Sequence, residues 1–136
     1  MTDCIFCKIV KGEVPSYKVY EDNKCLAFMD IFPKNEGHTL VIPKKHYEII
    51  TDAPDDVIKD VIVITKKLAK AVKEATNCDG FVISNNNGKH GGQEVPHIHF
   101  HIIPRFKEDG LKYTWPAKKF SEDQFRQSAD RIKSKL

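Results

Sequence analysis

The segment His97-Ile98-His99-Phe100-His101-Ile102-Ile103 alternates imidazole and apolar side chains, and this alternation is the strongest constraint on the fold. Successive side chains of a strand point to opposite faces, so the histidines share one face while Ile98, Phe100 and Ile102 share the other. Burial of the apolar face in a core would hold the imidazole face rigid, as a preorganised site requires. The alternation therefore predicts a sheet that is covered on one side and carries three imidazoles on the other.

A second pattern, from Pro54 to about Thr76, predicts one long helix. Its apolar residues recur at intervals of three and four, the spacing of one helix face: Val57, Val61, Ile64, Leu68, Val72 and Ala75. Thr51 or Asp52 is expected to cap the start of this helix, with Pro54 in its first turn. The turn residues at 77–80 are expected to end it.

The remaining chain supplies short elements around these two. Strands are predicted at 18–21, 25–30, 38–43, 81–83 and 97–106, and a short helix or knuckle at 3–11. Ser121 and Gln124 resemble a capping box that opens a C-terminal helix. Few parallel crossovers fit this order, which predicts an α+β fold with a mainly antiparallel sheet, one long central helix and a C-terminal helix. With 136 residues and no internal repeat or long linker, residues 1–136 are expected to form a single domain, with a C-terminal extension from about 107 to 136.

Net charge and hydropathy limit the classes of partner that we expect for this chain. The formal net charge of +3 is mildly basic and lacks the dense clustering of a nucleic-acid-binding surface, so no nucleic acid is expected and a small anionic ligand is compatible. The early apolar pairs Ile5-Phe6 and Ile9-Val10 are interrupted by Cys7, Lys8 and Lys11 and are too short for a signal peptide or a membrane span. We therefore expect a cytoplasmic protein without a membrane partner, whose cysteines are reduced or metal-bound.

The three histidines fit nucleophilic catalysis better than two alternatives. A neutral imidazole has a lone pair that can form a phosphoimidazole, while a neighbouring imidazole donates a hydrogen bond to the phosphate. Gly91, Gly92 and Gln93 directly precede the histidines and would let the backbone and an amide approach a phosphate. A binuclear metal site ranks lower, because no carboxylate lies between Val95 and Pro104. A half-exposed polar strand face is the second alternative.

Cys4 and Cys7 are separated by two residues, a gap that lets both thiolates reach one tetrahedral ion. His46 and His97 are candidates for the other two ligands, which would close a structural site. The alternative is a pair of reduced, partly buried cysteines. Cys25 and Cys78 are interpreted as packing or surface residues.

From about Asp3 to Arg105, the sequence resembles the histidine-triad (HIT) family, whose motif alternates histidine and hydrophobic residues as 97–103 does here. Segments 26–31 and 38–46 are similar to the Hint branch, the nucleoside phosphoramidases, more than to the dinucleoside triphosphate hydrolases. This resemblance implies a HIT-like fold and a hydrolase that forms a nucleotidyl-histidine intermediate on a purine nucleotide. Hydrolysis of dinucleoside polyphosphates and a nucleotide-binding regulatory role with incidental turnover are the alternatives.

The resemblance also implies residue roles. His99 corresponds to the nucleophile, His101 to a contact with the α-phosphate, and His38 to a catalytic histidine near the leaving group. Asp30 corresponds to the ribose-binding carboxylate. The purine slot and the phosphate-side contacts are implied at Ile31, with Phe6, Ile9 and Val14, and at Asn86, Gly92 and Gln93. Glu94 departs from the family, where a small hydroxyl residue occurs at this position in eukaryotic Hint proteins.

Some members of the family hold a structural zinc through a Cys-x-x-Cys element and two histidines. Those ligands correspond to Cys4, Cys7, His46 and His97 here. No organic cofactor is implied. The resemblance further implies a homodimer, with the long helix and the histidine-bearing sheet at its interface.

Overall fold

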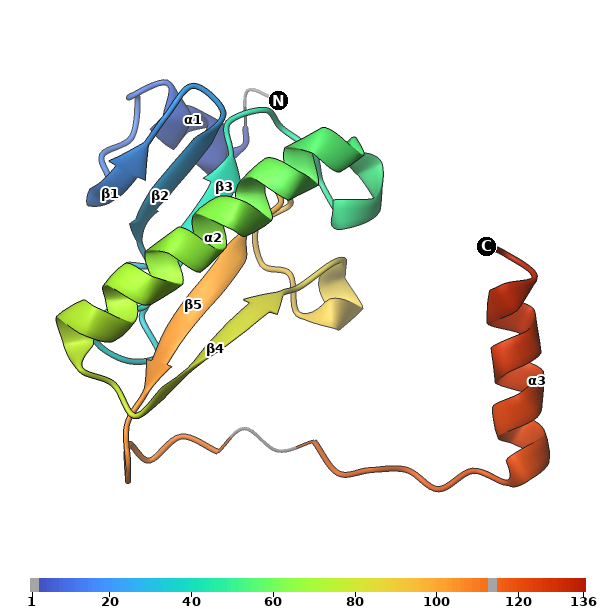
Figure 1. Ribbon diagram of the computed structural model, residues 1–136. Helices are drawn as coiled ribbons and strands as arrows, with labels where there is room; N and C mark the ends of the chain where they lie inside the picture. Colours follow the sequence, from blue (N-terminus) through green and yellow to red (C-terminus); the bar gives the residue numbers. More distant parts are fainter. Residues whose placement is uncertain (1–2, 113–114) are drawn as a thin grey trace.

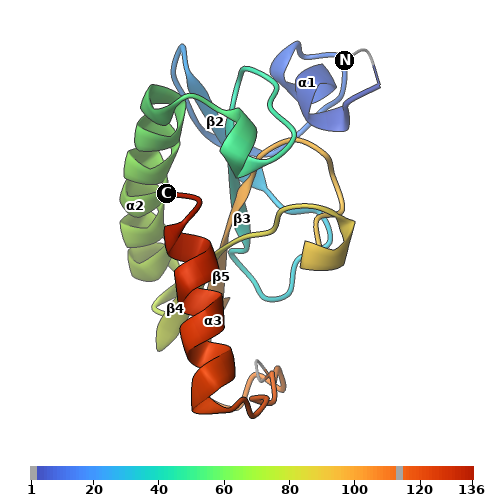
Figure 2. The ribbon, with the colours of Figure 1, turned by 90° about the vertical axis from the view of Figure 1, so that its right-hand side faces the viewer.

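The protein is described by a computed structural model covering residues 3–112 and 115–136. Its main elements are, in chain order, α1 (Ile5–Val10), β1 (Lys18–Glu21), β2 (Cys25–Met29), β3 (Thr39–Pro43), α2 (Asp55–Thr76), β4 (Gly80–Asn85), β5 (Phe100–Arg105) and α3 (Glu122–Lys133). The five strands form one sheet in the order β1-β2-β3-β5-β4, and every neighbouring pair is antiparallel. The predicted α+β class is confirmed. Helix α2 crosses one face of the sheet, and α1 lies on the opposite side (Figures 1 and 2).

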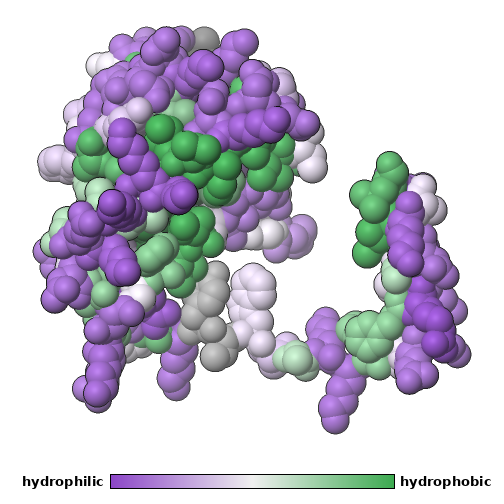
Figure 3. All heavy atoms as spheres, in the orientation of Figure 1, coloured by the Kyte–Doolittle hydropathy of each residue, from purple (hydrophilic) through white to green (hydrophobic). Residues whose placement is uncertain are grey.

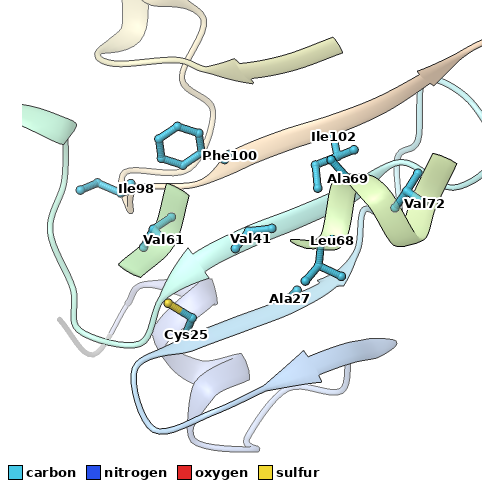
Figure 4. Close-up of a cluster of buried hydrophobic side chains, with 10 residues drawn as sticks. All are labelled: Cys25, Ala27, Val41, Val61, Leu68, Ala69, Val72, Ile98, Phe100 and Ile102. Carbon is cyan, nitrogen blue, oxygen red and sulfur yellow. The ribbon is translucent and has the colours of Figure 1, made fainter. Parts of the chain in front are cut away.

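The larger core lies between α2 and the sheet. Ile98, Phe100 and Ile102 pack here against the apolar stripe of α2, as the alternation and the helix periodicity predicted (Figure 4). The buried members of this cluster are Cys25, Ala27, Val41, Val61, Leu68, Ala69, Val72, Ile98, Phe100 and Ile102. This burial fixes one face of the histidine segment, so the imidazoles must project to the face that α1 covers.

A second, smaller core lies under α1. Phe6 and Ile9 of this short helix pack on the alternate side chains of β2 and β3, namely Leu26, Phe28, Leu40 and Ile42. Six residues form too short a helix to be stable alone, so packing holds α1 in place. Helix α1 therefore sits directly over the histidine-bearing face of the sheet.

The sequence predicted the C-terminal end of α2 correctly and its N-terminal cap incorrectly. Asn77 adopts a left-handed conformation (φ 52°) at the C-cap, so the predicted stop is confirmed. The predicted caps are wrong, because Thr51 and Asp52 belong to a separate 3₁₀ turn, Ile50–Asp52, and Pro54 is the N-cap. The Asp52 carboxylate accepts instead from the backbone N–H of Ile49 at 3.3 Å.

Strand β5 begins three residues later than predicted, at Phe100 instead of His97. The residues just before it form no ladder, and their hydrogen bonds go to a loop and to a side chain. The backbone N–H of Ile98 donates to the carbonyl of Tyr47 (2.8 Å), and the carbonyl of His99 accepts from the side chain of Asn85 (3.0 Å). His97 and His99 thus lie at the end of the sheet, and not within its ladder.

Beyond β5, residues 115–121 form an arm that leads to α3, which stands apart from the sheet (Figure 1). The predicted capping box is confirmed, since Ser121 and Gln124 exchange hydrogen bonds at the start of α3. Apolar side chains gather on the side of α3 that faces the body in Figure 3, and Phe125 and Ile132 are more than half exposed. Among the helices of the described segments, none has the length and apolar character needed to cross a bilayer.

Candidate functional site

A cavity of about 270 Å³ lies between α1, the loop that follows it, the ends of β2 and β3, and the histidine segment. Its walls are mostly apolar, with few polar groups. The lining residues include Asp30, Ile31, His99 and His101 together with Phe6, Ile9, Val14 and Glu94. The sequence had predicted all of these as site residues or, for Glu94, as a departure near the site. The fold brings them together from three separate segments, 6–14, 30–31 and 94–101.

His99 is 4% exposed and is held in one tautomer. Its Nδ1 lies 2.8 Å from the carbonyl oxygen of His97, and a carbonyl can only accept, so Nδ1 carries the proton. The Nε2 lone pair is then free. Burial lowers the pKa of His99, with the His97 carbonyl, Asp30 and Glu94 opposing that shift, so its neutral form is favoured. A buried, oriented, neutral imidazole at a cavity wall can act as a nucleophile.

A chain of hydrogen bonds also fixes the tautomer of His101. The backbone N–H of Lys34 donates to Nδ1 of His38 (3.0 Å), which leaves the His38 proton on Nε2. That Nε2–H lies 2.9 Å from Nδ1 of His101 and donates to it, so His101 carries its own proton on Nε2. Burial, and the proximity of His99 and His38, lower the pKa of His101 to about 4. His99 and His101 therefore present complementary groups, a lone pair and an N–H donor, with ring centroids 4.9 Å apart.

His38 is 1% exposed and is not among the residues that line the cavity. Both of its ring nitrogens are occupied by Lys34 and His101, and Asp30 Oδ2 lies 3.4 Å from Nε2. An effect of His38 on a ligand would therefore pass through His101 or Asp30, both of which line the cavity. His38 therefore lies behind His101, and its implied role as a catalytic histidine near the leaving group stays a prediction.

The glycine-rich loop at 86–93, which was predicted to contact phosphate, is held by hydrogen bonds within the loop and to the segment around Glu48. Asn86 Nδ2 donates to the carbonyl of Gly91 (2.7 Å), and Gly92 has φ 87°, a conformation that favours glycine. Gln93 accepts from the N–H of Gly88 (2.8 Å) and donates to the carbonyl of Glu48 (2.7 Å). These side chains fix the loop, and the residues assigned to the cavity wall do not include them.

Several cavity residues were not found from the sequence. Phe28 and Leu40 could have been, because they alternate with Asp30 and His38 and so share a face with them. Ser16 and Val95 gave no local signal, since their position depends on how distant segments pair. The missed lining residues are Ile5, Pro15, Ser16, Phe28, Met29, Phe32, Leu40 and Val95.

Next to the cavity, Cys4, Cys7, His46 and His97 gather their ligand atoms within 4.8 Å of one another. Nδ1 of His97 lies 3.4 Å from Sγ of Cys4, 3.7 Å from Sγ of Cys7 and 3.2 Å from Nδ1 of His46. A tetrahedral ion with Zn–S of about 2.3 Å and Zn–N of about 2.05 Å requires S···N edges of about 3.5 Å and N···N edges of about 3.3 Å. The cluster has these edges.

The chemistry of the donor atoms also suits a metal. The N–H of His97 Nε2 donates to the carbonyl of Pro43 (2.8 Å), which leaves the Nδ1 lone pair directed at the cluster. Sγ of Cys4 accepts from the backbone N–H of Cys7 (3.4 Å), a contact that orients this sulfur toward the cluster. The four residues therefore fit a zinc ion. His97 connects the two sites, because its imidazole belongs to the cluster while its carbonyl orients His99.

Comparisons with known proteins agree with this arrangement. The family model described as HIT domain matches residues 11–108. The adenosine 5'-monophosphoramidase HNT1 of Saccharomyces cerevisiae is 44% identical over 134 residues, covering 98% of this chain and 82% of that protein.

Solved structures give the same result. The crystal structure of a HIT family member from Bacillus subtilis has a TM-score of 0.92 and 39% identity, covering 98% of this chain and 97% of that one. A histidine triad nucleotide-binding protein from Candida albicans has a TM-score of 0.88 and 40% identity, with the same coverage. The similarity thus extends beyond the matched region to the arm and α3.

Proposed function

This chain belongs to the HIT domain family, and from that premise we propose that it hydrolyses purine nucleoside 5'-phosphoramidates, or related nucleotides, through a nucleotidyl-His99 intermediate. The observation that carries the proposal is the hydrogen bond from His99 Nδ1 to the carbonyl of His97, which leaves Nε2 as a lone pair at the cavity wall. The name of the yeast relative supports the substrate class.

In the first step, Nε2 of His99 attacks the α-phosphorus and the P–N bond breaks. The leaving amine takes up a proton from solvent, which the attacking water of the second step returns, while the nucleotidyl group stays on His99. In the second step, water attacks the same phosphorus, loses a proton and releases the nucleoside 5'-monophosphate and free His99. The Nε2–H of His101 would stabilise charge on the phosphate oxygens in both steps, and His38 would hold it in that orientation.

The binding roles follow the lining of the cavity. Asp30 is assigned to the ribose hydroxyls, and its carboxylate is already oriented by the backbone N–H of Phe32 at 2.8 Å. Ile31, with the apolar wall of the cavity, is assigned to the purine. Asn86, Gly92 and Gln93 are assigned to the phosphate side, where they would act by fixing the loop that precedes the histidines.

We assign a structural zinc to the Cys/His cluster formed by Cys4, Cys7, His46 and His97, on the strength of its tetrahedral spacing. When bound, the ion would supply a fixed anchor for His97. The thiols of the cluster require a reducing compartment, which supports a cytoplasmic location. No organic cofactor is needed for the two steps above.

We propose a homodimer through the side of the molecule where α2 and β4 meet. β4 is an edge strand of the sheet, and Phe81 and Ile83 on it are 40% exposed beside Ile62 of α2. An exposed apolar edge strand favours pairing with a second copy. Replacing Ile83 with Glu is expected to convert the dimer to a monomer by analytical ultracentrifugation, whereas Ser128→Glu on α3 should not. A monomeric wild-type protein would contradict this proposal.

The ratio of kcat/KM for an adenosine 5'-phosphoramidate to that for diadenosine tetraphosphate, at equal pH and ionic strength, tests the proposed substrate class. We expect a ratio above one, because a polyphosphate leaving group needs positive charge, while the cavity wall carries the carboxylates of Asp30 and Glu94. A ratio below one would move the protein to the polyphosphate hydrolases. Nucleotide binding without turnover of either substrate would indicate a regulatory binding module instead.

A further inference from the structure

The cavity contains one polar group to which neither the family motif nor the proposed mechanism gives a role. The hydroxyl oxygen of Ser16 is buried and has no hydrogen-bond partner, and it is the one side-chain oxygen or nitrogen of this kind in the described residues. A buried hydroxyl without a partner costs about 1–3 kcal/mol, so an orphan of this kind calls for a physical explanation. Ser16 lines the same cavity as Asp30 and His99, which makes a ligand the natural partner.

The pairing of β1 and β2 shows where in the cavity Ser16 lies. Lys18 is opposite Phe28, and the backbone N–H of Met29 donates to the carbonyl of Tyr17 at 2.9 Å. Continuing this antiparallel register by one residue brings Ser16 opposite Asp30. By this register, Ser16 lies across from Asp30, the residue that the proposed function assigns to the ribose.

Apart from Asp30, which the proposed function assigns to the ribose, the residues around this position offer the hydroxyl no partner. Val14 and Pro15 precede Ser16, Ile9 and Ile31 line the same cavity, and none of the four has a polar side-chain atom. A purine stacked among these side chains, with its ribose at Asp30, presents ring nitrogen N3 on the edge next to the sugar. N3 is a hydrogen-bond acceptor in both adenine and guanine. A hydroxyl can donate to it at little conformational cost.

We propose that Ser16 is a base-recognition residue, whose hydroxyl donates a hydrogen bond to the sugar-side ring nitrogen N3 of the bound purine. This inference rests on the proposed function, because it takes the cavity as the nucleotide site. The proposed contact explains why a serine occurs in an apolar wall, because the bound purine gives its hydroxyl the hydrogen-bond partner that it lacks in the free protein. It also makes Ser16 a determinant of affinity for purines that does not touch the reacting atoms.

Equilibrium binding of AMP and 3-deaza-AMP to wild type and Ser16→Ala, measured by calorimetry, tests the contact directly. Removing either partner is expected to weaken binding about 5- to 10-fold, the value of one neutral hydrogen bond. When the Ser16 hydroxyl and N3 are both absent, as in Ser16→Ala with 3-deaza-AMP, binding should be no weaker than when only one of them is absent. Ser16→Thr keeps the hydroxyl and should still discriminate between the two nucleotides, whereas Ser128→Ala on exposed α3 should bind both as wild type does.

A second measurement separates ligand recognition from a structural role. Ser16→Ala should not lower the melting temperature of the free protein, because no hydrogen bond is lost in that state. The inference is overturned if wild type binds AMP and 3-deaza-AMP equally, or if Ser16→Ala weakens both to the same degree. A failure of AMP to bind wild type would overturn the proposed function as well, whereas phosphoramidate turnover without discrimination against 3-deaza substrates would overturn this inference alone.

Discussion

Replacing Cys4 with Ser tests whether the Cys/His cluster holds a metal and how that metal supports the active histidine. The substitution removes one thiolate from a set whose spacing fits a tetrahedral zinc. His97 is 0% exposed, so without the ion its buried Nδ1 would be left with only Cys7 and His46 as neighbours in the cluster. We expect Cys4→Ser to lose the zinc and to destabilise the fold.

The magnitude follows from the size of the chain. Zinc present at 1,000 times its dissociation constant stabilises the folded state by about 4 kcal/mol. A domain of 136 residues unfolds with an entropy of about 0.3 kcal/mol per kelvin, so this loss lowers the melting temperature by roughly 10–15 °C. The value of kcat should fall less than about tenfold. The reason is that His99 is oriented by the backbone carbonyl of His97, and not by the imidazole that the ion would hold.

The assay combines metal analysis of protein purified without chelator or metal-affinity resin with scanning calorimetry in the presence and absence of a chelator. Wild type should contain close to one zinc per chain and should melt lower with chelator, whereas Cys4→Ser should contain none and ignore the chelator. Cys78→Ser is the matched control, since Cys78 is a free cysteine outside the cluster. Metal-free wild type, or a Cys4→Ser variant that melts with wild type, would refute the reasoning.

Three further predictions concern the histidines. His99→Ala should lower turnover by at least about a thousandfold and abolish an acid- or base-trapped nucleotidyl-protein while retaining AMP binding; labelling of another histidine would contradict the assignment. His38→Asn should lower kcat roughly 10- to 100-fold, because the donor to Nδ1 of His101 is lost, and crystallography of the variant should find the His101 ring reoriented. The folded pKa of His101, about 4, lies below its ordinary value, so its contribution to stability is present above about pH 6.5 and is lost as pH falls toward 4. Thermal melts over this range should show that loss in wild type and a smaller one in His101→Asn.

The fold could be predicted as far as its signals were local. The periodicity of 54–76 and the alternation of 97–103 each predict which residues face the core. The alternation is confirmed, and the helix face is confirmed from Val61 to Val72, whereas Ala75 near the end of α2 is exposed. Helix starts are harder, because Thr51, Asp52 and Pro54 all suit a first turn and tertiary packing decides among them. Here the chain forms a separate 3₁₀ turn, and the expected cap, Asp52, serves that turn.

In the candidate site as well, residues that belong to a local motif could be predicted, and residues placed by tertiary pairing could not. Residues that carry chemistry, such as Asp30 and His99, were visible as residue types in a motif. Ser16 was not, because its place opposite Asp30 depends on the register between β1 and β2, which no local pattern determines. The tautomers were equally hidden, since that of His101 depends on a backbone N–H of Lys34 reaching His38.

The late start of β5 explains how the histidine segment can present an oriented lone pair. In a continuous antiparallel ladder, backbone carbonyls are taken up in pairs by the neighbouring strands. Because regular pairing begins only at Phe100, the carbonyl of His97 can accept from Nδ1 of His99, while the N–H of Ile98 finds Tyr47 instead. The same break lets the His97 side chain reach the Cys/His cluster. Alternation thus provides the shared face, and the end of the strand provides the oriented lone pair.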